Sequence, residues 1–209
     1  YYEGYSNSTI WPLCHYFFSH TTVRKEYWES YQKVNALFCE EICKQVGSGD
    51  WVWIQDYQLM LLPGMLRKMP NLHIGYFHHI PFPSYELFRI LPERAELLNG
   101  LMGADFIGFH THDYMRYFIN AVERVLHIKF DLDEAQTDSR IVRVNALPMG
   151  INYELYNHSS ATPKVWSEIE KKRILFRNHK LLLSVDRLDY SKGILHRLQG
   201  FETFLERHP

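Results

Sequence analysis

Two cations flank a turn near the carboxyl end of the sequence. Arg187 and Lys192 lie in a polar run that follows an apolar segment and ends at Gly193, before a helical pattern. A helix start with nearby cations is a ready site for phosphate or diphosphate. Two fixed cations can stabilise the negative charge of a departing diphosphate without a metal ion. The same cations could instead pair with Asp186 and Asp189 on a solvated surface, and the residues alone leave the two interpretations balanced.

His79 is a candidate for contact with a sugar hydroxyl. It opens a loop in which Pro81 and Pro83 remove backbone donors and fix φ, so the loop is stiff and holds the imidazole in one orientation. The alternative is a structural histidine between strand and helix, which is the commoner role for any single one of the twelve histidines. His78 points to the opposite face of the strand and is interpreted as structural.

Asp56 follows the apolar run Trp51–Ile54, with Gln55 between them. A carboxylate at a strand end can accept hydrogen bonds from sugar hydroxyls or take part in proton transfer. It can also cap the helix that follows, and for this residue alone the cap is slightly favoured.

An aromatic cluster stands at the front of the sequence, formed by Tyr2, Tyr5 and Trp11. Such a cluster could wall a sugar pocket, although packing in a core is the more usual explanation.

These candidates follow short apolar runs that predict strands buried on both faces. The runs are 51–54, 74–77, 105–109, 141–144 and 181–185. Longer amphipathic patterns predict helices over 27–46, 59–68, 94–102, 113–126, 163–176 and 194–205. The alternation predicts an α/β fold with a mostly parallel sheet covered by helices. Ligands of such sheets bind beyond the carboxyl ends of the strands, where the candidate residues lie.

Proline and glycine near Leu147–Ile151 indicate a domain boundary. Residues 1–150 are expected to form most of one doubly wound domain, and residues 151–209 the opening of a second.

Composition excludes several classes of function. The 23 Lys and Arg residues balance 24 Asp and Glu residues, so there is no basic excess for nucleic-acid binding. No apolar stretch approaches the roughly 20 residues of a membrane helix, and no signal peptide is recognisable. The three cysteines cannot all pair and include no C-x-x-C, which favours a reduced, cytoplasmic protein.

Five ordered segments resemble the trehalose-6-phosphate synthases, glycosyltransferase family 20. They are YYEGYSN through IWP at 1–12, WVWIQDYQLMLLP at 51–63, HIPFPSYELFRILP at 79–92, IGFHTHDYMRYF at 107–118 and SVDRLDYSKG at 184–193. Their order and spacing cover essentially the whole chain, so a false match is far less probable than for any single motif.

The resemblance implies a GT-B fold of two Rossmann-like domains, with the acceptor side in residues 1–150 and the start of the donor domain in 151–209. It implies retaining transfer of glucose from a nucleotide donor to glucose 6-phosphate, without metal or other cofactor. UDP-glucose is the default donor, while ADP and GDP donors and a homo-oligomer stay open. By the same resemblance Tyr2, Trp11 and Asp56 bind the acceptor, His79 contacts the donor glucose, and Arg187 and Lys192 bind the diphosphate.

The resemblance also implies a front-face substitution, in which the departing diphosphate helps to deprotonate the incoming hydroxyl, so no protein nucleophile is expected.

Many relatives carry His where this chain has Gln55 and Gln58, which is interpreted as lineage variation because the aspartate between them is retained. A substrate-closing loop is expected before Tyr1 and most of the donor domain after Pro209, so the chain alone is not expected to be fully active.

Two other classes of function compete with the transferase. Asp56, His79, His110 and His112 could ligate Zn²⁺ or Fe in a metal-dependent hydrolase. A catalytically silent homologue that senses a sugar phosphate would keep the fold, but it would have no need of the diphosphate pair.

Overall fold

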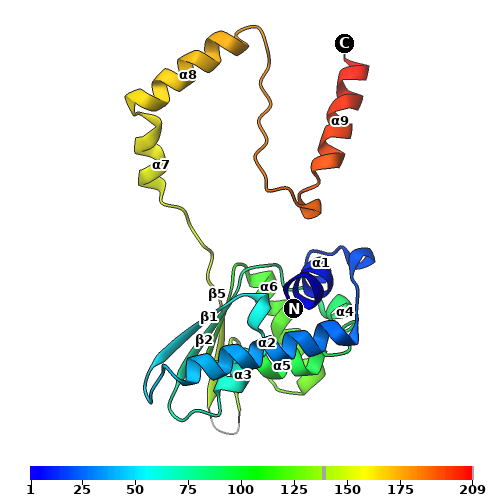
Figure 1. Ribbon diagram of the computed structural model, residues 1–209, viewed down its shortest axis with the longest axis vertical. Helices are drawn as coiled ribbons and strands as arrows, with labels where there is room; N and C mark the ends of the chain where they lie inside the picture. Colours follow the sequence, from blue (N-terminus) through cyan, green and yellow to red (C-terminus); the bar gives the residue numbers. More distant parts are fainter. Residues whose placement is uncertain (138–139, 209) are drawn as a thin grey trace. The chain divides into compact units, whose positions relative to one another are not determined.

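The computed structural model describes residues 1–137 and 140–208. The chain divides into two compact units, Tyr1–Pro148 and Met149–Pro209. The first unit contains a sheet with helices packed beside it, whereas the described part of the second contains helices and connecting segments (Figure 1). No helix in the described ranges is long and apolar enough to cross a membrane.

The sheet of the first unit has the order β1-β2-β3-β5-β4 among the described residues. Strands β1, β2, β3 and β5 run parallel, and β4 pairs antiparallel with β5 at one edge. Their bounds are Trp51–Gln55, His73–His78, Phe106–Phe109, Glu134–Gln136 for β4, and Ile141–Ala146 for β5. The four parallel strands confirm the prediction. Strand β4 was not predicted, because its three residues form no apolar run.

The register places one row of apolar side chains across all four parallel strands: Ile54, Tyr76, Ile107 and Val144. All four are buried in the core. Helices cover this core, with α3 contacting both α2 and α5, and α5 contacting α6. Their bounds are Lys25–Cys43 for α2, Leu62–Leu66 for α3, Arg94–Leu101 for α5 and His112–Leu126 for α6.

The expectation that every strand is buried on both faces is wrong for β1. Trp51 and Trp53 are 81% and 54% exposed, while Ile54, on the other face of the strand, is buried. Strand β1 lies at the edge of the sheet, so it has a hydrogen-bonded neighbour on one side only. An edge strand with one covered face can present large side chains to solvent.

Shorter elements complete the first unit. A π-helix η1 spans Tyr2–Ile10, followed by α1 at Trp11–Cys14 and a 3-10 turn η2 at Phe18–His20. The predicted helix over 59–68 is instead a 3-10 turn, η3, at Tyr57–Leu59 and the short α3, whose first turn contains Pro63. Helix α4 spans Tyr85–Phe88.

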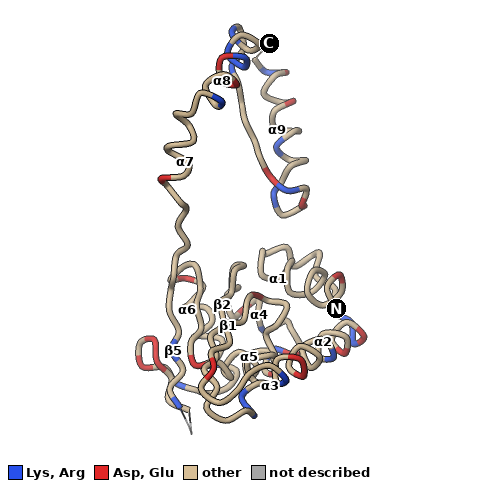
Figure 2. Tube along the Cα trace, turned by 60° about the vertical axis from the view of Figure 1, so that its left-hand side comes forward, with Lys and Arg blue, Asp and Glu red and all other residues tan. Residues whose placement is uncertain are grey.

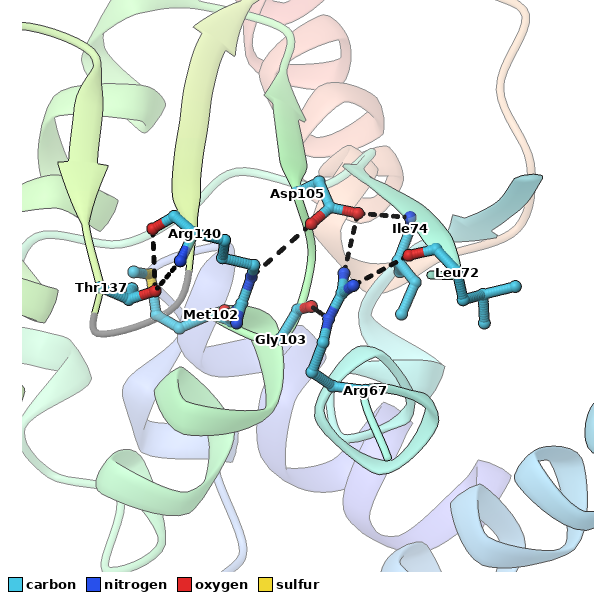
Figure 3. A network of polar contacts seen from close by, with 8 residues as sticks. All are labelled: Arg67, Leu72, Ile74, Met102, Gly103, Asp105, Thr137 and Arg140. Atoms are coloured by element: carbon cyan, nitrogen blue, oxygen red, sulfur yellow. Dashed lines mark hydrogen bonds and ion pairs between the residues drawn. The ribbon is translucent and has the colours of Figure 1, made fainter. Parts of the chain in front are cut away.

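An ionic network joins the amino-terminal ends of the strands (Figure 3). The carboxylate of Asp105 lies 2.8 Å from Nη2 of Arg67 and 3.6 Å from Nε of Arg140, and it accepts a hydrogen bond from the backbone N–H of Ile74. Arg67 also donates to the carbonyl oxygens of Gly103 and Leu72, both at 2.8 Å. The network therefore ties α3 to the starts of β2, β3 and β5, at the opposite end of the sheet from the candidate site.

The second unit contains α7 at Tyr153–Ser160, α8 at Pro163–Phe176, the 3-10 turn η4 at Tyr190–Lys192 and α9 at Ile194–Arg207. Helix α8 carries charges of both signs (Figure 2), and Glu168 pairs with Lys171 and Glu170 with Arg173 at 2.7 Å. Helices α8 and α9 match their predicted ranges, whereas α7 was not predicted.

The predicted strand over residues 181–185 does not form. A strand is stabilised by hydrogen bonds to a neighbouring strand. The described residues of the second unit include no other strand, so this apolar segment has no partner there. An apolar run therefore predicts a strand correctly only where a neighbouring strand is present to pair with it.

Candidate active site

The carboxyl ends of β1, β2 and β3 bring three of the loops rich in polar residues together. Gln55 pairs in register with Phe77, and His78 with Phe109. Parallel strands in this register end at the same edge of the sheet, so Gln55, Asp56, His79 and His110 lie near one another.

Asp56 holds two of these loops together. Its Oδ1 accepts hydrogen bonds from the backbone N–H of Tyr57 at 2.9 Å and of His79 at 3.0 Å. The residue therefore caps η3, as the capping interpretation predicted, and also fixes the loop after β2. Burial raises the pKa of the Asp56 carboxyl, although hydrogen bonds from the backbone N–H groups and the nearby His79 act in the opposite direction.

The backbone of Asp56 adopts φ 70° and ψ 174°. This region is sparsely populated by residues other than glycine and costs on the order of 1–3 kcal/mol. Such conformations persist where surrounding contacts over-determine them, and they concentrate at functional sites. The strain at Asp56 is therefore an independent indication that this strand end has a function.

The imidazole of His79 is held from several sides. Its Nε2 lies 2.5 Å from Oε1 of Gln55. Its ring centroid lies 4.6 Å from that of Phe77 and 5.4 Å from that of His110, whose ring is inclined to it by 61°. Burial lowers the pKa of His110, and the neighbouring His79 lowers it further. The sequence prediction of a stiffly held imidazole at this position agrees with these contacts.

His78 lies in the core, as its position on the opposite face of β2 predicts. It is fully buried, with Nδ1 3.0 Å from Oη of Tyr76. Burial lowers the pKa of His78 to about 3. The side chain is therefore neutral at physiological pH and is unavailable to a ligand.

The aromatic residues at the front of the chain divide into core and surface. Tyr5 is fully buried, with its hydroxyl bonded to Glu93 at 3.0 Å, so it belongs to the core. The ring of Trp11 lies 5.8 Å from that of Tyr57, the residue after Asp56, with the two planes tilted by 48°. Tyr2 is 53% exposed on η1. Trp11 and Tyr2 are thus the two members available to line a pocket.

In the second unit, Arg187 and Lys192 flank a turn that is organised by Asp189. The carboxylate of Asp189 accepts hydrogen bonds from the backbone N–H and the hydroxyl of Ser191, at 2.9 and 2.8 Å. Burial raises the pKa of the Asp189 carboxyl, but the bonds from Ser191 and the charges of the two cations outweigh it, so the pKa is lowered.

Asp186 pairs with Arg197 of α9 at 2.8 Å, and among the described residues this is its ion pair. Of the surface alternative, in which the two cations pair with Asp186 and Asp189, Asp189 remains, because the charges of Arg187 and Lys192 act on its carboxyl. Gly193, at φ 60°, turns the chain into α9 directly after Lys192. Lys192 thus ends η4 directly before the start of α9, while Arg187 precedes that turn in the chain.

The ligand set of the hydrolase alternative is not assembled. Within residues 1–137 and 140–208, no three His, Cys, Asp or Glu side chains are grouped as a metal site would require. Asp56, His79, His110 and His112 therefore do not form a common coordination sphere.

Sequence reasoning missed the contacts of two side chains at this edge. The sequence presents Gln55 only as a variation on the family pattern and His110 only as a possible metal ligand, whereas in the structure Gln55 bonds His79 and the ring of His110 packs against that of His79. Residues two apart on a strand share a face. Gln55 is exposed at the end of β1, beside the end of β2, and this position was the signal that its side chain could reach His79.

Comparison with known proteins agrees with the architecture and the strand-end motifs. A curated alpha,alpha-trehalose-phosphate synthase (UDP-forming) of Pichia angusta is 44% identical, covering all of this chain and 45% of the relative. A solved E. coli structure with bound UDP-2-fluoro glucose is 31% identical with a TM-score of 0.91, covering all of this chain and 47% of the other. A Burkholderia xenovorans alpha,alpha-trehalose-phosphate synthase (UDP-forming) in complex with glucose-6-phosphate is 30% identical with a TM-score of 0.87, again over 100% and 47%.

The chain thus spans less than half the length of these relatives. The structural similarity extends over both units and identifies the fold as that of the GT-B trehalose-6-phosphate synthases. Since the model of glycosyltransferase family 20 matches residues 1–209, the chain belongs to that family.

Proposed function

We propose that the protein containing this chain transfers glucose from UDP-glucose to glucose 6-phosphate and forms trehalose 6-phosphate with retention of configuration. The observation that carries this proposal is the family match over residues 1–209, combined with relatives described as UDP-forming synthases. The arrangement of polar side chains at the ends of β1, β2 and β3 supports it, because this is where ligands of parallel sheets bind.

The first unit supplies the acceptor side in this proposal. Asp56 accepts hydrogen bonds from hydroxyls of glucose 6-phosphate, and Tyr2 and Trp11 wall its pocket. The half-buried carboxylate of Asp56 supports the role, because its fixed backbone contacts orient it before the substrate arrives. His79, held by its neighbours, contacts a hydroxyl of the donor glucose.

The second unit supplies the donor side. Arg187 and Lys192 bind the diphosphate and offset the charge that grows on it as the glycosidic bond breaks. No protein carboxylate is assigned as a nucleophile. The departing diphosphate takes the proton of the acceptor hydroxyl on the same face of the sugar, so the residues of this chain bind, orient and neutralise charge.

A cytoplasmic location is part of the proposal. Cys14, Cys39 and Cys43 are all free thiols, and reduced thiols are typical of that compartment.

The proposal is tested on the protein at its natural length, incubated with UDP-glucose, glucose 6-phosphate and a chelator. We expect release of UDP and formation of a non-reducing disaccharide phosphate. Arg187→Ala and Lys192→Ala should each lower kcat by about 10²-fold or more, as loss of a charge-stabilising donor does in other enzymes. Arg177→Ala, an exposed cation at the end of α8, is the matched control and should leave the rate unchanged.

Absence of product with UDP-, ADP- and GDP-glucose, while glucose 6-phosphate still binds, would contradict the transferase and favour a sugar-phosphate sensor. Activity that survives both substitutions would contradict the diphosphate site.

A further inference from the structure

Gln55 contacts His79 because of the register of the sheet. Gln55 is the last residue of β1 and lies opposite Phe77 of β2. Side chains two residues apart share a face of a strand, so His79, just beyond β2, emerges on the same side as Phe77. The amide of Gln55 therefore reaches the imidazole across the strand ends, and its Oε1 lies 2.5 Å from Nε2 of His79.

The other contacts of His79 do not determine its tautomer. Its backbone N–H donates to Asp56, and the ring packs against Phe77 and His110. These contacts fix the position and the plane of the ring, but the two aromatic neighbours do not determine which ring nitrogen carries the proton. Only a hydrogen bond to a ring nitrogen makes that choice.

We propose that Gln55 is a positioning residue, which sets the tautomer of His79. With the amide oxygen facing Nε2, a hydrogen bond exists only if Nε2 carries the proton and donates it. The neutral ring then presents Nδ1 as an acceptor. An acceptor nitrogen held in place selects a ligand that donates, as a sugar hydroxyl does.

An amide has a property at this position that an imidazole lacks. The side chain of glutamine carries no titratable proton, so its oxygen stays an acceptor at every physiological pH. A histidine at position 55 could switch between donor and acceptor, and the tautomer of His79 would then depend on two coupled groups. With Gln55 as the partner, the tautomer of His79 does not depend on the titration of a second group.

The effect of this choice on catalysis rests on the proposed function, because the hydroxyl in question is that of the donor glucose. The choice of tautomer itself does not, since it concerns only side chains within the first unit. The two parts can therefore be tested separately.

The first test observes the ring directly, in the protein at its natural length labelled with ¹⁵N-histidine, at about pH 8, above the ordinary histidine pKa of about 6.5. The His79 signals are assigned by their loss in His79→Asn. We expect a pyrrole-type Nε2 bearing an exchange-protected proton and a pyridine-type Nδ1. Gln55→Met, nearly isosteric and at an exposed position, should abolish the protection and average the two nitrogens.

Two further variants sharpen this test. Gln55→Glu keeps an acceptor oxygen and should keep the Nε2 proton protected from exchange, while its negative charge favours a second proton on Nδ1. Gln45→Met, an exposed glutamine just after α2, is the matched control and should change nothing. A wild-type His79 protonated on Nδ1, or identical His79 signals in wild type and Gln55→Met, would overturn the proposal.

The second test is kinetic. Gln55→Met should lower kcat/KM for UDP-glucose by roughly tenfold, the effect of one hydrogen bond, while the KM for glucose 6-phosphate stays unchanged. Gln45→Met should leave both unchanged. An equal loss for both substrates would contradict a role directed at the donor. If wild type forms no product but the ring signals behave as expected, the transferase proposal fails and the positioning role stands. If wild type is active but the ring signals do not respond to Gln55→Met, the transferase proposal stands and the positioning role fails.

Discussion

At the scale of single residues, Asp56 has the capping role that the sequence presented as the alternative to sugar binding, and the proposed acceptor role is compatible with it. Its carboxylate caps η3 and fixes the His79 loop, while its strained backbone lies at the edge of the sheet where ligands bind. The capping hydrogen bonds engage one carboxylate oxygen, Oδ1, so they orient the carboxyl group and leave it able to accept further hydrogen bonds. The two roles can be separated by substitutions that remove either the charge or the hydrogen-bond acceptor.

Asp56→Asn keeps an acceptor oxygen for the backbone N–H groups of Tyr57 and His79. We expect its free energy of unfolding to stay within about 1 kcal/mol of wild type, whereas Asp56→Ala should lose about 2 kcal/mol because two donors lose their partner. Both should weaken binding of glucose 6-phosphate. Urea unfolding and calorimetric titration measure the two effects, and equal stability of the two variants would contradict the capping role.

His78 illustrates a residue whose chemistry is suppressed by burial. Its pKa is about 3 in the folded protein and about 6.5 in an unfolded chain, so between these values the unfolded state binds a proton that the folded core does not. The contribution of neutral His78 to the free energy of unfolding is fully present above about pH 6.5. Below that pH the free energy of unfolding falls by about 1.4 kcal/mol per pH unit.

His78→Gln keeps a polar partner for Tyr76 but does not titrate. The slope of the free energy of unfolding against pH, measured by urea unfolding between about pH 6.5 and 4.5, should therefore be shallower in the variant by about one proton. Parallel curves for wild type and variant would show that His78 is accessible to protons in the folded state.

At the scale of elements, the two ends of the sheet have different tasks. The carboxyl ends carry the candidate site, and the amino ends are joined by Asp105 with its two arginines. The side chain of Asp105 is 33% exposed, and those of its partners Arg67 and Arg140 are 25% and 20% exposed. Partly buried charges that also make backbone hydrogen bonds contribute more than surface pairs.

Asp105→Ala should lower the free energy of unfolding by about 2–3 kcal/mol, because two arginines and the N–H of Ile74 lose a shared acceptor. Glu41→Ala is the control, since its pair with Lys44 is as short, at 2.6 Å, but largely exposed, and should cost at most about 1 kcal/mol. The strand-end site lies at the other end of the sheet, so substrate affinity of the folded Asp105→Ala protein should be unchanged. A cost no larger than that of the control would contradict the network.

At the scale of the whole molecule, the two units differ in how they are stabilised. The first unit has a contiguous core, whereas the described residues of the second include no buried hydrophobic side chain. Most helix stability in proteins comes from packing of an apolar face and not from intrinsic propensity. The second unit of this chain is therefore expected to open more readily than the first.

Hydrogen exchange of the 209-residue chain measures this difference. Amides of β2, β3 and α5 should exchange slowest, and those of residues 181–185 and α9 should exchange fastest, since they lack a strand partner or a packed core. Comparable protection in the two units would show that the second is stabilised by contacts that its own residues do not supply.

The sequence by itself determined the parallel strands, the longer helices and the residues at the strand ends, because apolar periodicity and the strand-to-loop transition are local properties. Strand β4 and the failure of the strand over 181–185 were decided by pairing, which depends on residues distant in the chain or on a neighbour being present. The contact between Gln55 and His79 was likewise decided by the register of two strands. Local patterns predict which residues can react, but only the tertiary structure decides which of them meet, because register and face are relations between elements.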